Sequence, residues 1–310
     1  MEEIYCFAGN PLDRADERRR DACWLASLLD EPSSRLLPLR DLKPPVHNGG
    51  EVELEWQPVE PWRPHIEAGA TLVLLGLGDG RAYFALDASG ADLRPDPATE
   101  NIDVRTLAPL ISPGEAAILA EARSLIDWHA RHRFCAQCAT PSVVAAGGWT
   151  RHCPSCKAHH FPRVDPVVIM LAVHGERALL GRGRRRPGAR FSCLAGYMEP
   201  GETLEEAVRR EVREESGIRC GRVRYLASQP WPFPSTLMMG FLAEALTEEI
   251  TVDTEELVEA RWFERDEIRD MVARAAAGDP DPATQVPSLP GPVAIAHQIC
   301  RRWATGNDSV

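Results

Sequence analysis

The sequence predicts an α/β (α+β) protein in which a small cysteine-rich module separates two larger domains. Three observations support this prediction. Strand–turn–strand patterns recur in both halves of the chain, amphipathic helices follow them, and four cysteines gather between residues 135 and 156. A chain of 310 residues has room for two domains and a small third module. We expect an N-terminal domain over 1–134, the cysteine module over 135–160 and a C-terminal domain over 161–310.

Composition and charge exclude several classes of protein. Hydrophobic residues make up 44% of the chain, enough for buried cores, which excludes global disorder. The longest apolar runs, 71–77 and 167–173, are far shorter than a membrane span of about 20 residues, and the first residues lack a secretory signal pattern. The net charge of −11 argues against non-specific binding to nucleic acid; it suits either recruitment of divalent cations or simple solubility. We therefore expect a cytoplasmic protein with no membrane partner.

The N-terminal domain is expected to mix helices and strands. A helix is predicted over 16–29, a short strand over 51–56 and a long helix over 113–132. Between them, residues 71–86 predict a strand, an Asp-Gly turn and a second strand. The hairpin expected over 167–182 has the same pattern. We therefore predict a degenerate internal duplication in which only the second copy keeps the chemistry.

The cysteine module has the spacing of a zinc site. Two Cys-x2-Cys pairs are separated by fourteen residues, and their members are Cys135, Cys138, Cys153 and Cys156. Four thiolates complete a tetrahedral shell, so the predicted Zn²⁺ is structural rather than catalytic. The neighbouring histidines are spare candidate ligands that we expect to lie at the surface. The total of nine cysteines is odd, which argues against a disulfide framework.

The most informative segment runs from Gly196 to Ile218. Thr203 and Glu206 fit a capping box and Gly217 fits a left-handed C-cap, so a helix is predicted between them. At 100° per residue its apolar stripe is defined by Leu204, Ala207, Val208 and Val212. The same stripe carries three carboxylates, Glu211, Glu214 and Glu215. Carboxylates on a half-buried face repel one another and lose solvation unless cations neutralise them, and Mg²⁺ or Mn²⁺ prefers such oxygen ligands. A solvated run of charge is the alternative interpretation.

This segment resembles the Nudix box, G-x5-E-x7-R-E-U-x-E-E-x-G-U, in which U is aliphatic. Every constrained position matches, namely Gly196, Glu202, Arg210, Glu211, Val212, Glu214, Glu215, Gly217 and Ile218. The resemblance implies a Nudix fold over 161–310, an α/β/α sandwich around a mixed sheet, and a degenerate Nudix-like N-terminal domain.

The same resemblance implies metal-dependent hydrolysis of a nucleoside diphosphate that is linked to another moiety. The three glutamates of the stripe would bind Mg²⁺ or Mn²⁺, and Glu215 is the candidate to act on the attacking water as well. Arg210 and Glu202 would be a structural ion pair that orients the loop and the helix. Divalent ions suit this chemistry because they neutralise the pyrophosphate and lower the pKa of bound water.

A proline-rich segment beyond the box narrows the substrate. Residues 228–236 read SQPWPFPST, and the prolines stiffen the backbone around two aromatic side chains. A proline-rich turn with buried aromatics is one interpretation. The segment also resembles the hallmark of the NADH pyrophosphatase subfamily, whose other feature is a zinc ribbon upstream of the box. This resemblance implies cleavage of NADH or NAD⁺ to nicotinamide mononucleotide and AMP, removal of NAD caps from RNA 5′ ends in some members, and a homodimer.

The subfamily resemblance also implies roles for single residues. Phe161 and Tyr197 would stack on base rings. Ala195 would offer a backbone carbonyl, and Glu256 a carboxylate, to the metal, although a surface position is the alternative for Glu256. Ala294 would lie in the last loop that meets the substrate. The dinucleotide would be lined by Gln229, Pro230, Trp231, Pro232, Phe233, Pro234, Ser235 and Thr236.

Two other functions are compatible with the same motifs. Another Nudix hydrolase, acting on ADP-ribose or a dinucleoside polyphosphate, would share the box but not the SQPWPFP segment. A zinc-ribbon regulator that only senses nucleotides would not need the intact glutamates of the box. The sequence departs from the subfamily pattern at Gly148, where a carboxylate is expected just before Trp149.

Overall fold

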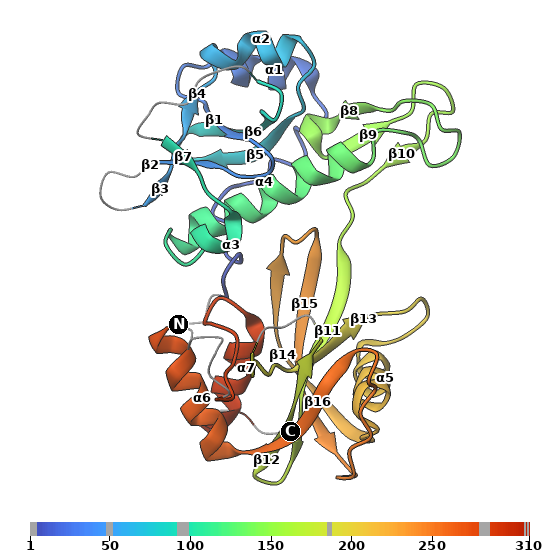
Figure 1. The fold of residues 1–310 in the computed structure, drawn as a ribbon. Coiled ribbons are helices and arrows are strands. Elements are labelled where there is room, and N and C mark those ends of the chain that lie inside the picture. Colours follow the sequence, from blue (N-terminus) through green and yellow to red (C-terminus); the bar gives the residue numbers. More distant parts are fainter. Residues whose placement is uncertain are drawn as a thin grey trace. The chain divides into compact units, whose positions relative to one another are not determined.

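The chain forms two compact units, each with its own core (Figure 1). The computed structural model describes residues 5–47, 52–91, 99–184, 188–278, 286–306, 308 and 310. Unit 1 contains Met1–Val164 together with Pro230–Ser235, and unit 2 contains Asp165–Gln229 together with Thr236–Val310. The cysteine module therefore belongs to the first unit, as does the central part of the proline-rich segment.

Unit 1 is built on a four-stranded sheet of order β4-β1-β6-β5, in which β1 runs parallel to β6. Its first elements are α1 (Ala22–Asp30), β1 (Arg35–Leu39), β2 (Pro45–His47), β3 (Glu53–Leu54), β4 (Gln57–Pro58), a 3-10 turn (Glu60–Trp62) and α2 (Arg63–Glu67). The remaining elements before the cysteine module are β5 (Leu72–Gly78), β6 (Arg81–Asp87), β7 (Thr99–Asn101), α3 (Val104–Leu107) and α4 (Pro113–Arg131).

The elements of unit 1 confirm most of the local predictions. The β5–β6 hairpin turns at Asp79-Gly80, and α4 begins with a capping box between Ser112 and Glu115. The first helix was predicted too early. It begins at Ala22, because the Asp21 side chain caps the helix there by accepting hydrogen bonds from the backbone N–H groups of Cys23 and Trp24. The strand predicted over 51–56 is shorter, β3, and residue 51 lies outside the described residues.

The cysteine module adds a second small sheet to unit 1. It contains β8 (Val143–Ala145), a 3-10 turn (Ala146–Gly148), β9 (Thr150–His152) and β10 (His159–His160), in the order β10-β9-β8. The Gly148 backbone lies so close to β5 that a Cβ would come within 2.7 Å of Val73. The close approach explains why a side chain is not tolerated at this position, where the subfamily pattern has a carboxylate.

Unit 2 contains a mixed six-stranded sheet of order β14-β15-β11-β12-β16, with β13 paired to β11. Strand β11 is parallel to β15 and antiparallel to β12 and β13. The elements are β11 (Asp165–His174), β12 (Arg177–Gly183), β13 (Leu194–Tyr197), α5 (Leu204–Ser216), β14 (Cys220–Trp231), β15 (Thr236–Ala245), β16 (Leu257–Glu264), α6 (Arg265–Ala277) and α7 (Ile295–Ala304). Among the described helices of both units, none has the length and apolarity that a bilayer span requires.

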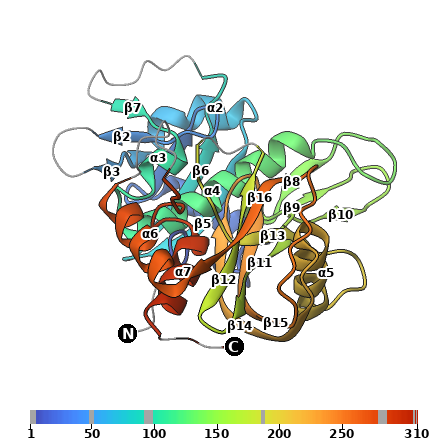
Figure 2. The same ribbon diagram turned by 60° about the horizontal axis from the view of Figure 1, so that its bottom comes forward.

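Helices cover both faces of the unit 2 sheet, α5 on one side and α6 with α7 on the other (Figures 1 and 2). Alternating residues of β11, such as Val168 and Met170, share one core with Val208 of α5. On the opposite face Gly240 of β15 makes room for α7, because a Cβ there would meet Ile299 at 3.0 Å. The predicted α/β/α sandwich around a mixed sheet is confirmed.

Candidate functional site

Helix α5 forms as the sequence predicted. The Thr203 hydroxyl accepts a hydrogen bond from the Glu206 backbone N–H, and the Glu206 carboxylate accepts one from the Thr203 backbone N–H. At the other end Gly217 adopts a left-handed conformation with φ of 74°. The two caps fix where the helix begins and ends, and the packing of Ala207, Val208 and Val212 in the sheet core sets which face it buries.

The carboxylates of the stripe differ in burial. Glu211 is 8% exposed and Glu215 is 5% exposed, so both lie on the face that packs against the sheet. The Glu214 side chain is 60% exposed, because it lies at the edge of the stripe rather than at its centre. Two buried carboxylates, at 211 and 215, and one exposed carboxylate, at 214, therefore lie in the last turns of the helix.

The Glu211 carboxyl group lies directly against the backbone of β13. A Cβ on Gly196 would come within 1.9 Å of Glu211 Cδ, so only glycine permits this approach. The neighbouring residue of β13, Ala195, is exposed. The glycine at the first position of the box thus has a direct physical cause, which is the position of the Glu211 carboxyl group.

Arg210 connects the loop before the helix to the carboxylates. Its Nε and one Nη bond the Glu202 carboxylate at 2.5 and 3.0 Å, which confirms the predicted ion pair. The other Nη donates to Glu211 at 2.7 Å and to Glu214 at 3.1 Å. A further bond to the Tyr197 carbonyl at 2.8 Å ties the guanidinium to β13. Arg210 therefore holds the loop, the strand and the helix in one arrangement.

The electrostatics of this group favour a bound cation. Burial raises the pKa of Glu211, the Arg210 guanidinium opposes that shift, and the charges of Glu214 and Glu256 add to it. Glu256 belongs to a loop that is held to the end of α5, because the Asp253 N–H donates to the Glu215 carbonyl at 3.1 Å. Glu211 and Glu215 are buried and Glu214 and Glu256 are exposed, and together they offer the all-oxygen donor chemistry that Mg²⁺ and Mn²⁺ prefer. These residues fit such an ion by donor type, whereas among the described residues only the four cysteines already have their ligand atoms gathered closely enough for a metal.

The four cysteines of the module come together as predicted. Their ligand atoms all lie within 4.8 Å of one another, and the Sγ atoms of Cys135 and Cys156 are 3.5 Å apart. A tetrahedral Zn²⁺ with Zn–S bonds of about 2.3 Å places the sulfurs roughly 3.8 Å apart, so the four thiols fit zinc. Both Cys-x2-Cys turns have the same backbone hydrogen bonds, from Ala139 N–H to the Cys135 carbonyl and from Lys157 N–H to the Cys153 carbonyl. The two cysteine turns of the module therefore share one backbone arrangement.

Among the predicted substrate residues of unit 2, Gln229 and Ala294 lie together. The buried Gln229 amide donates to the Val293 carbonyl at 2.8 Å and accepts from the Ile295 N–H at 2.9 Å, so it holds the backbone on both sides of Ala294. Tyr197 is 58% exposed beside the box, whereas Thr236 is buried in β15. Gln229 thus positions the loop before α7 by hydrogen bonds from its side chain to the backbone of that loop.

The tip of the proline-rich segment packs within unit 1. The rings of Trp231 and Phe233 lie 5.2 Å apart and both contact Phe7 edge-on, at 5.8 and 6.0 Å. Arg123 of α4 donates to the Pro232 carbonyl and stacks on Phe233 at 4.7 Å, and Arg105 of α3 lies over the same ring at 4.2 Å. The predicted residue Phe161 also belongs to unit 1 and is 68% exposed.

Sequence reasoning missed the three residues that hold this tip, Phe7, Arg105 and Arg123. Each is more than 100 residues away from it, and none belongs to a motif. One signal was available on α4, where Glu121, Asp127 and His129 occupy buried positions of an otherwise apolar face. Buried polar groups need hydrogen-bond partners, so these residues signal contacts of α4, which the structure shows to be Asn10 for Glu121 and Arg151 for His129 rather than the tip.

Comparisons with protein families cover nearly the whole chain. A family model described as "NUDIX domain" matches residues 162–285. A second, "NADH pyrophosphatase zinc ribbon domain", matches residues 130–161, and a third, "NADH pyrophosphatase-like rudimentary NUDIX domain", matches residues 33–128. The third match agrees with the degenerate duplication predicted from the two hairpins.

Curated relatives resemble the chain over most of its length. It is 36% identical over 355 residues to "NAD-capped RNA hydrolase NUDT12" of Homo sapiens, covering 98% of this chain and 74% of that protein. It is 38% identical over 297 residues to "NAD-capped RNA hydrolase NudC" of Mycobacterium bovis (strain ATCC BAA-935 / AF2122/97), covering 94% and 92%. A solved "NUDIX hydrolase from Nitrosomonas europaea" is 23% identical, with a TM-score of 0.43, and covers 56% of this chain and 90% of that one.

Proposed function

Because the chain belongs to the Nudix hydrolase family, in its NADH pyrophosphatase branch, we propose that it hydrolyses the pyrophosphate of NADH and NAD⁺ and removes NAD caps from RNA 5′ ends. The observation that carries this proposal is the glutamate group of α5, held against Gly196 and tied together by Arg210. The products are nicotinamide mononucleotide and AMP, or nicotinamide mononucleotide and a 5′-monophosphate RNA. The relatives at 36–38% identity support the NAD-cap part of the proposal.

The side chains of the site divide the work of the reaction. Glu211, Glu214, Glu215 and Glu256, with the Ala195 carbonyl, are proposed to hold Mg²⁺ or Mn²⁺. Such ions neutralise the pyrophosphate and lower the pKa of a bound water. Glu215 is the proposed acceptor of the water's proton. Arg210 keeps Glu211 in position and is a positioning residue.

Substrate recognition is proposed to come from the aromatic and proline-rich residues. Phe161 and Tyr197 present exposed rings that suit stacking on nicotinamide or adenine. The segment from Pro230 to Ser235 gains its fixed shape from contacts within unit 1, so residues far from the box influence how the dinucleotide is bound. Gln229 and Ala294 contribute through the loop before α7.

A substrate panel tests this proposal. NADH, NAD⁺, NAD-capped RNA, ADP-ribose and a dinucleoside polyphosphate are each incubated with Mg²⁺ or Mn²⁺, and products are separated by chromatography. We expect turnover of NADH and the NAD-capped RNA, and none without a divalent ion. Turnover of ADP-ribose in the absence of NADH turnover would contradict the substrate assignment and leave the Nudix chemistry intact. Nucleotide binding without turnover of any substrate would favour a sensor instead.

Three further assignments belong to the same proposal. The domain division is 1–134, 135–160 and 161–310, with Cys135, Cys138, Cys153 and Cys156 holding a structural Zn²⁺. A homodimer is supported by large apolar side chains that are exposed on unit 1, among them Phe134 and Val164, and light scattering measures it. A cytoplasmic location is supported by the nine cysteines, none of which forms a disulfide, because reduced thiols suit a reducing compartment.

A further inference from the structure

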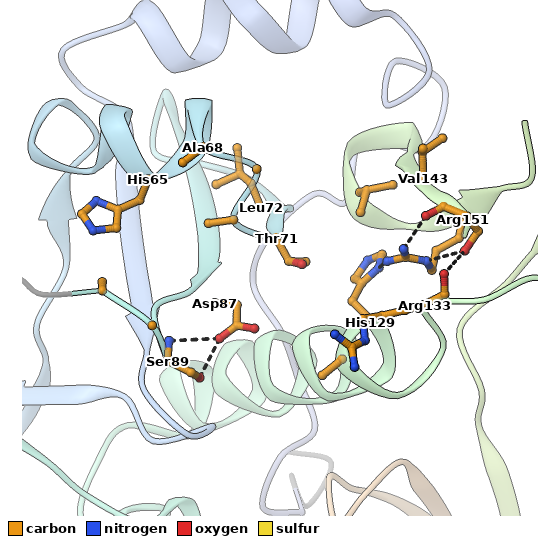
Figure 3. A pocket seen from close by; sticks show the side chains of 17 residues that line it. His65, Ala68, Thr71, Leu72, Asp87, Ser89, His129, Arg133, Val143 and Arg151 are labelled. Atoms are coloured by element: carbon orange, nitrogen blue, oxygen red, sulfur yellow. Dashed lines mark hydrogen bonds between the residues drawn. The ribbon is translucent and has the colours of Figure 1, made fainter. Parts of the chain in front are cut away.

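Unit 1 contains a pocket of about 1080 Å³ that no part of the proposed reaction uses (Figure 3). Its walls come from the segment after α2, the end of β6, the end of α4, and strands β8 and β9 of the cysteine module. The volume slightly exceeds the roughly 300–1,000 Å³ that is usual for small-ligand pockets. The pocket therefore has room for a molecule of nucleotide size.

The wall of this pocket contains a buried arginine, Arg151, which is 7% exposed. Its Nε donates to Ser142 Oγ at 2.8 Å, one Nη donates to the Ser142 carbonyl at 2.6 Å, and the other contacts His129 Nδ1 at 3.1 Å. These three bonds use three of the five N–H groups of a guanidinium, which leaves one N–H on each Nη. Within the described part of the chain, Arg151 has no carboxylate partner.

The imidazole ring of His129, which contacts Arg151, is neutral. Its Nε2 lies 2.7 Å from the Gly148 carbonyl, so Nε2 carries the proton and Nδ1 accepts from Arg151. Burial lowers the pKa of His129 to about 4, so the ring is neutral at physiological pH. The charge of Arg151 is thus buried among neutral acceptors, which is costly unless an anion offsets it.

A second cation lies on the same side of the pocket. Figure 3 shows Arg133 beside His129 and Arg151, with Asp87 and Ser89 across from them. Asp87 is the one carboxylate among the lining residues, and it accepts two hydrogen bonds from Ser89, at 3.1 and 2.7 Å. The pocket therefore has a basic side with two guanidinium groups and a polar side that suits hydroxyl groups.

We propose that this pocket binds a phosphate-bearing small molecule of nucleotide size, with its phosphate on Arg133 and Arg151. The planar fork of a guanidinium group matches two oxygens of a phosphate. Two guanidinium groups on one wall therefore offer several N–H donors to the same phosphate. The ribose or a similar hydroxyl-bearing group would face Asp87 and Ser89. The residues that line the site all belong to unit 1 and include none of the glutamates of α5, so the proposal goes beyond the proposed hydrolysis.

The test observes Arg151 directly in the full-length, zinc-loaded protein. The Nε–H resonance of Arg151 is followed by nuclear magnetic resonance and assigned by its loss in Arg151→Lys. Sodium phosphate is titrated against sodium chloride at equal ionic strength, and then AMP against adenosine. We expect phosphate and AMP to move the resonance to saturation, and chloride and adenosine to leave it in place.

Variants of the pocket wall complete the test. Arg133→Gln should raise the half-saturating phosphate concentration about tenfold, the loss expected for one charge-assisted hydrogen bond. Arg20→Gln removes the same charge from an exposed position of unit 1 outside the pocket, and it should change that concentration less than about twofold. Val144→Asp places a carboxylate on the exposed part of the wall and should abolish the response.

Three results would overturn the proposal. Equal shifts with chloride and phosphate would show that Arg151 responds only to salt. Equal effects of Arg133→Gln and Arg20→Gln would remove the pocket from the explanation. Saturation by adenosine as readily as by AMP would show that the phosphate is not recognised, and Arg151 would then be a purely structural link between α4 and the cysteine module.

Discussion

Replacing Gly196 with alanine would separate the chemistry of the site from the stability of the fold. The added Cβ would lie 1.9 Å from Cδ of Glu211 and 2.0 and 2.1 Å from its carboxylate oxygens. An ordinary contact begins at 3.4 Å, so the carboxyl group must move by 3.4 − 1.9 = 1.5 Å. A misplacement of roughly 1 Å at a catalytic group costs on the order of 10²-fold in rate. We therefore expect kcat for NADH to fall at least ~100-fold, or about 2.7 kcal/mol.

The stability of the variant should change little. The clashing atoms are the end of a flexible side chain, which can rotate away, and alanine is favoured over glycine in a strand by roughly 0.5–1 kcal/mol. The assay is NADH turnover with Mn²⁺, measured beside urea unfolding and Mn²⁺ binding. The matched control is Gly114→Ala in α4, where the new Cβ meets Pro11 at an ordinary 3.5 Å. Turnover of Gly196→Ala within threefold of the parent protein would refute the role given to the Glu211 carboxylate.

Four further changes test other parts of the structure. Glu215→Gln should lower turnover of NADH by at least ~100-fold with a melting temperature close to that of the parent protein, because it removes a charge and keeps the shape. Arg123→Ala should raise KM for NADH about tenfold and leave kcat nearly constant, since it frees the tip at Pro232 and Phe233. Cys153→Ser should abolish zinc binding, seen by atomic absorption, and lower the melting temperature. Burial raises the pKa of Glu121 to about 7 from 4.5. Its contribution to stability is therefore complete below pH 4.5 and is lost, by about 3 kcal/mol, as the pH rises to 7; denaturant titrations of Glu121→Gln should lack this slope.

Helix α5 was predictable because all its information is local. Thr203, Glu206 and Gly217 set its ends, and the 100° rotation per residue then places Glu211 and Glu215 on the buried face without knowledge of any other element. The same reasoning placed Glu214 on this face, and for Glu214 the prediction was wrong, because its side chain is 60% exposed. Glu214 lies at the edge of the stripe, where a rotation of one residue separates a buried from an exposed position. The four cysteines were predictable for a related reason, because each Cys-x2-Cys pair lies on one short turn that brings its two thiols together.

Contacts between distant residues were not predictable in this way. Phe7 and Arg123 meet the tip at Trp231–Phe233 across more than 100 residues, and no period or spacing in the sequence records such a pairing. Arg151 is a similar case. A lone arginine in a strand predicts a solvated side chain, and only the packing of α4 against the module buries it.

These distant contacts give the N-terminal domain a part in positioning the proline-rich tip. The N-terminal domain has no glutamate-bearing box, yet its helices α3 and α4 supply the two arginines that enclose the ring of Phe233. Three prolines stiffen the backbone of this loop but do not determine where the loop packs. Its position therefore depends on the surface that its tip contacts. The N-terminal domain supplies that surface, and loss of this contact would weaken dinucleotide binding while leaving the glutamates of α5 in place.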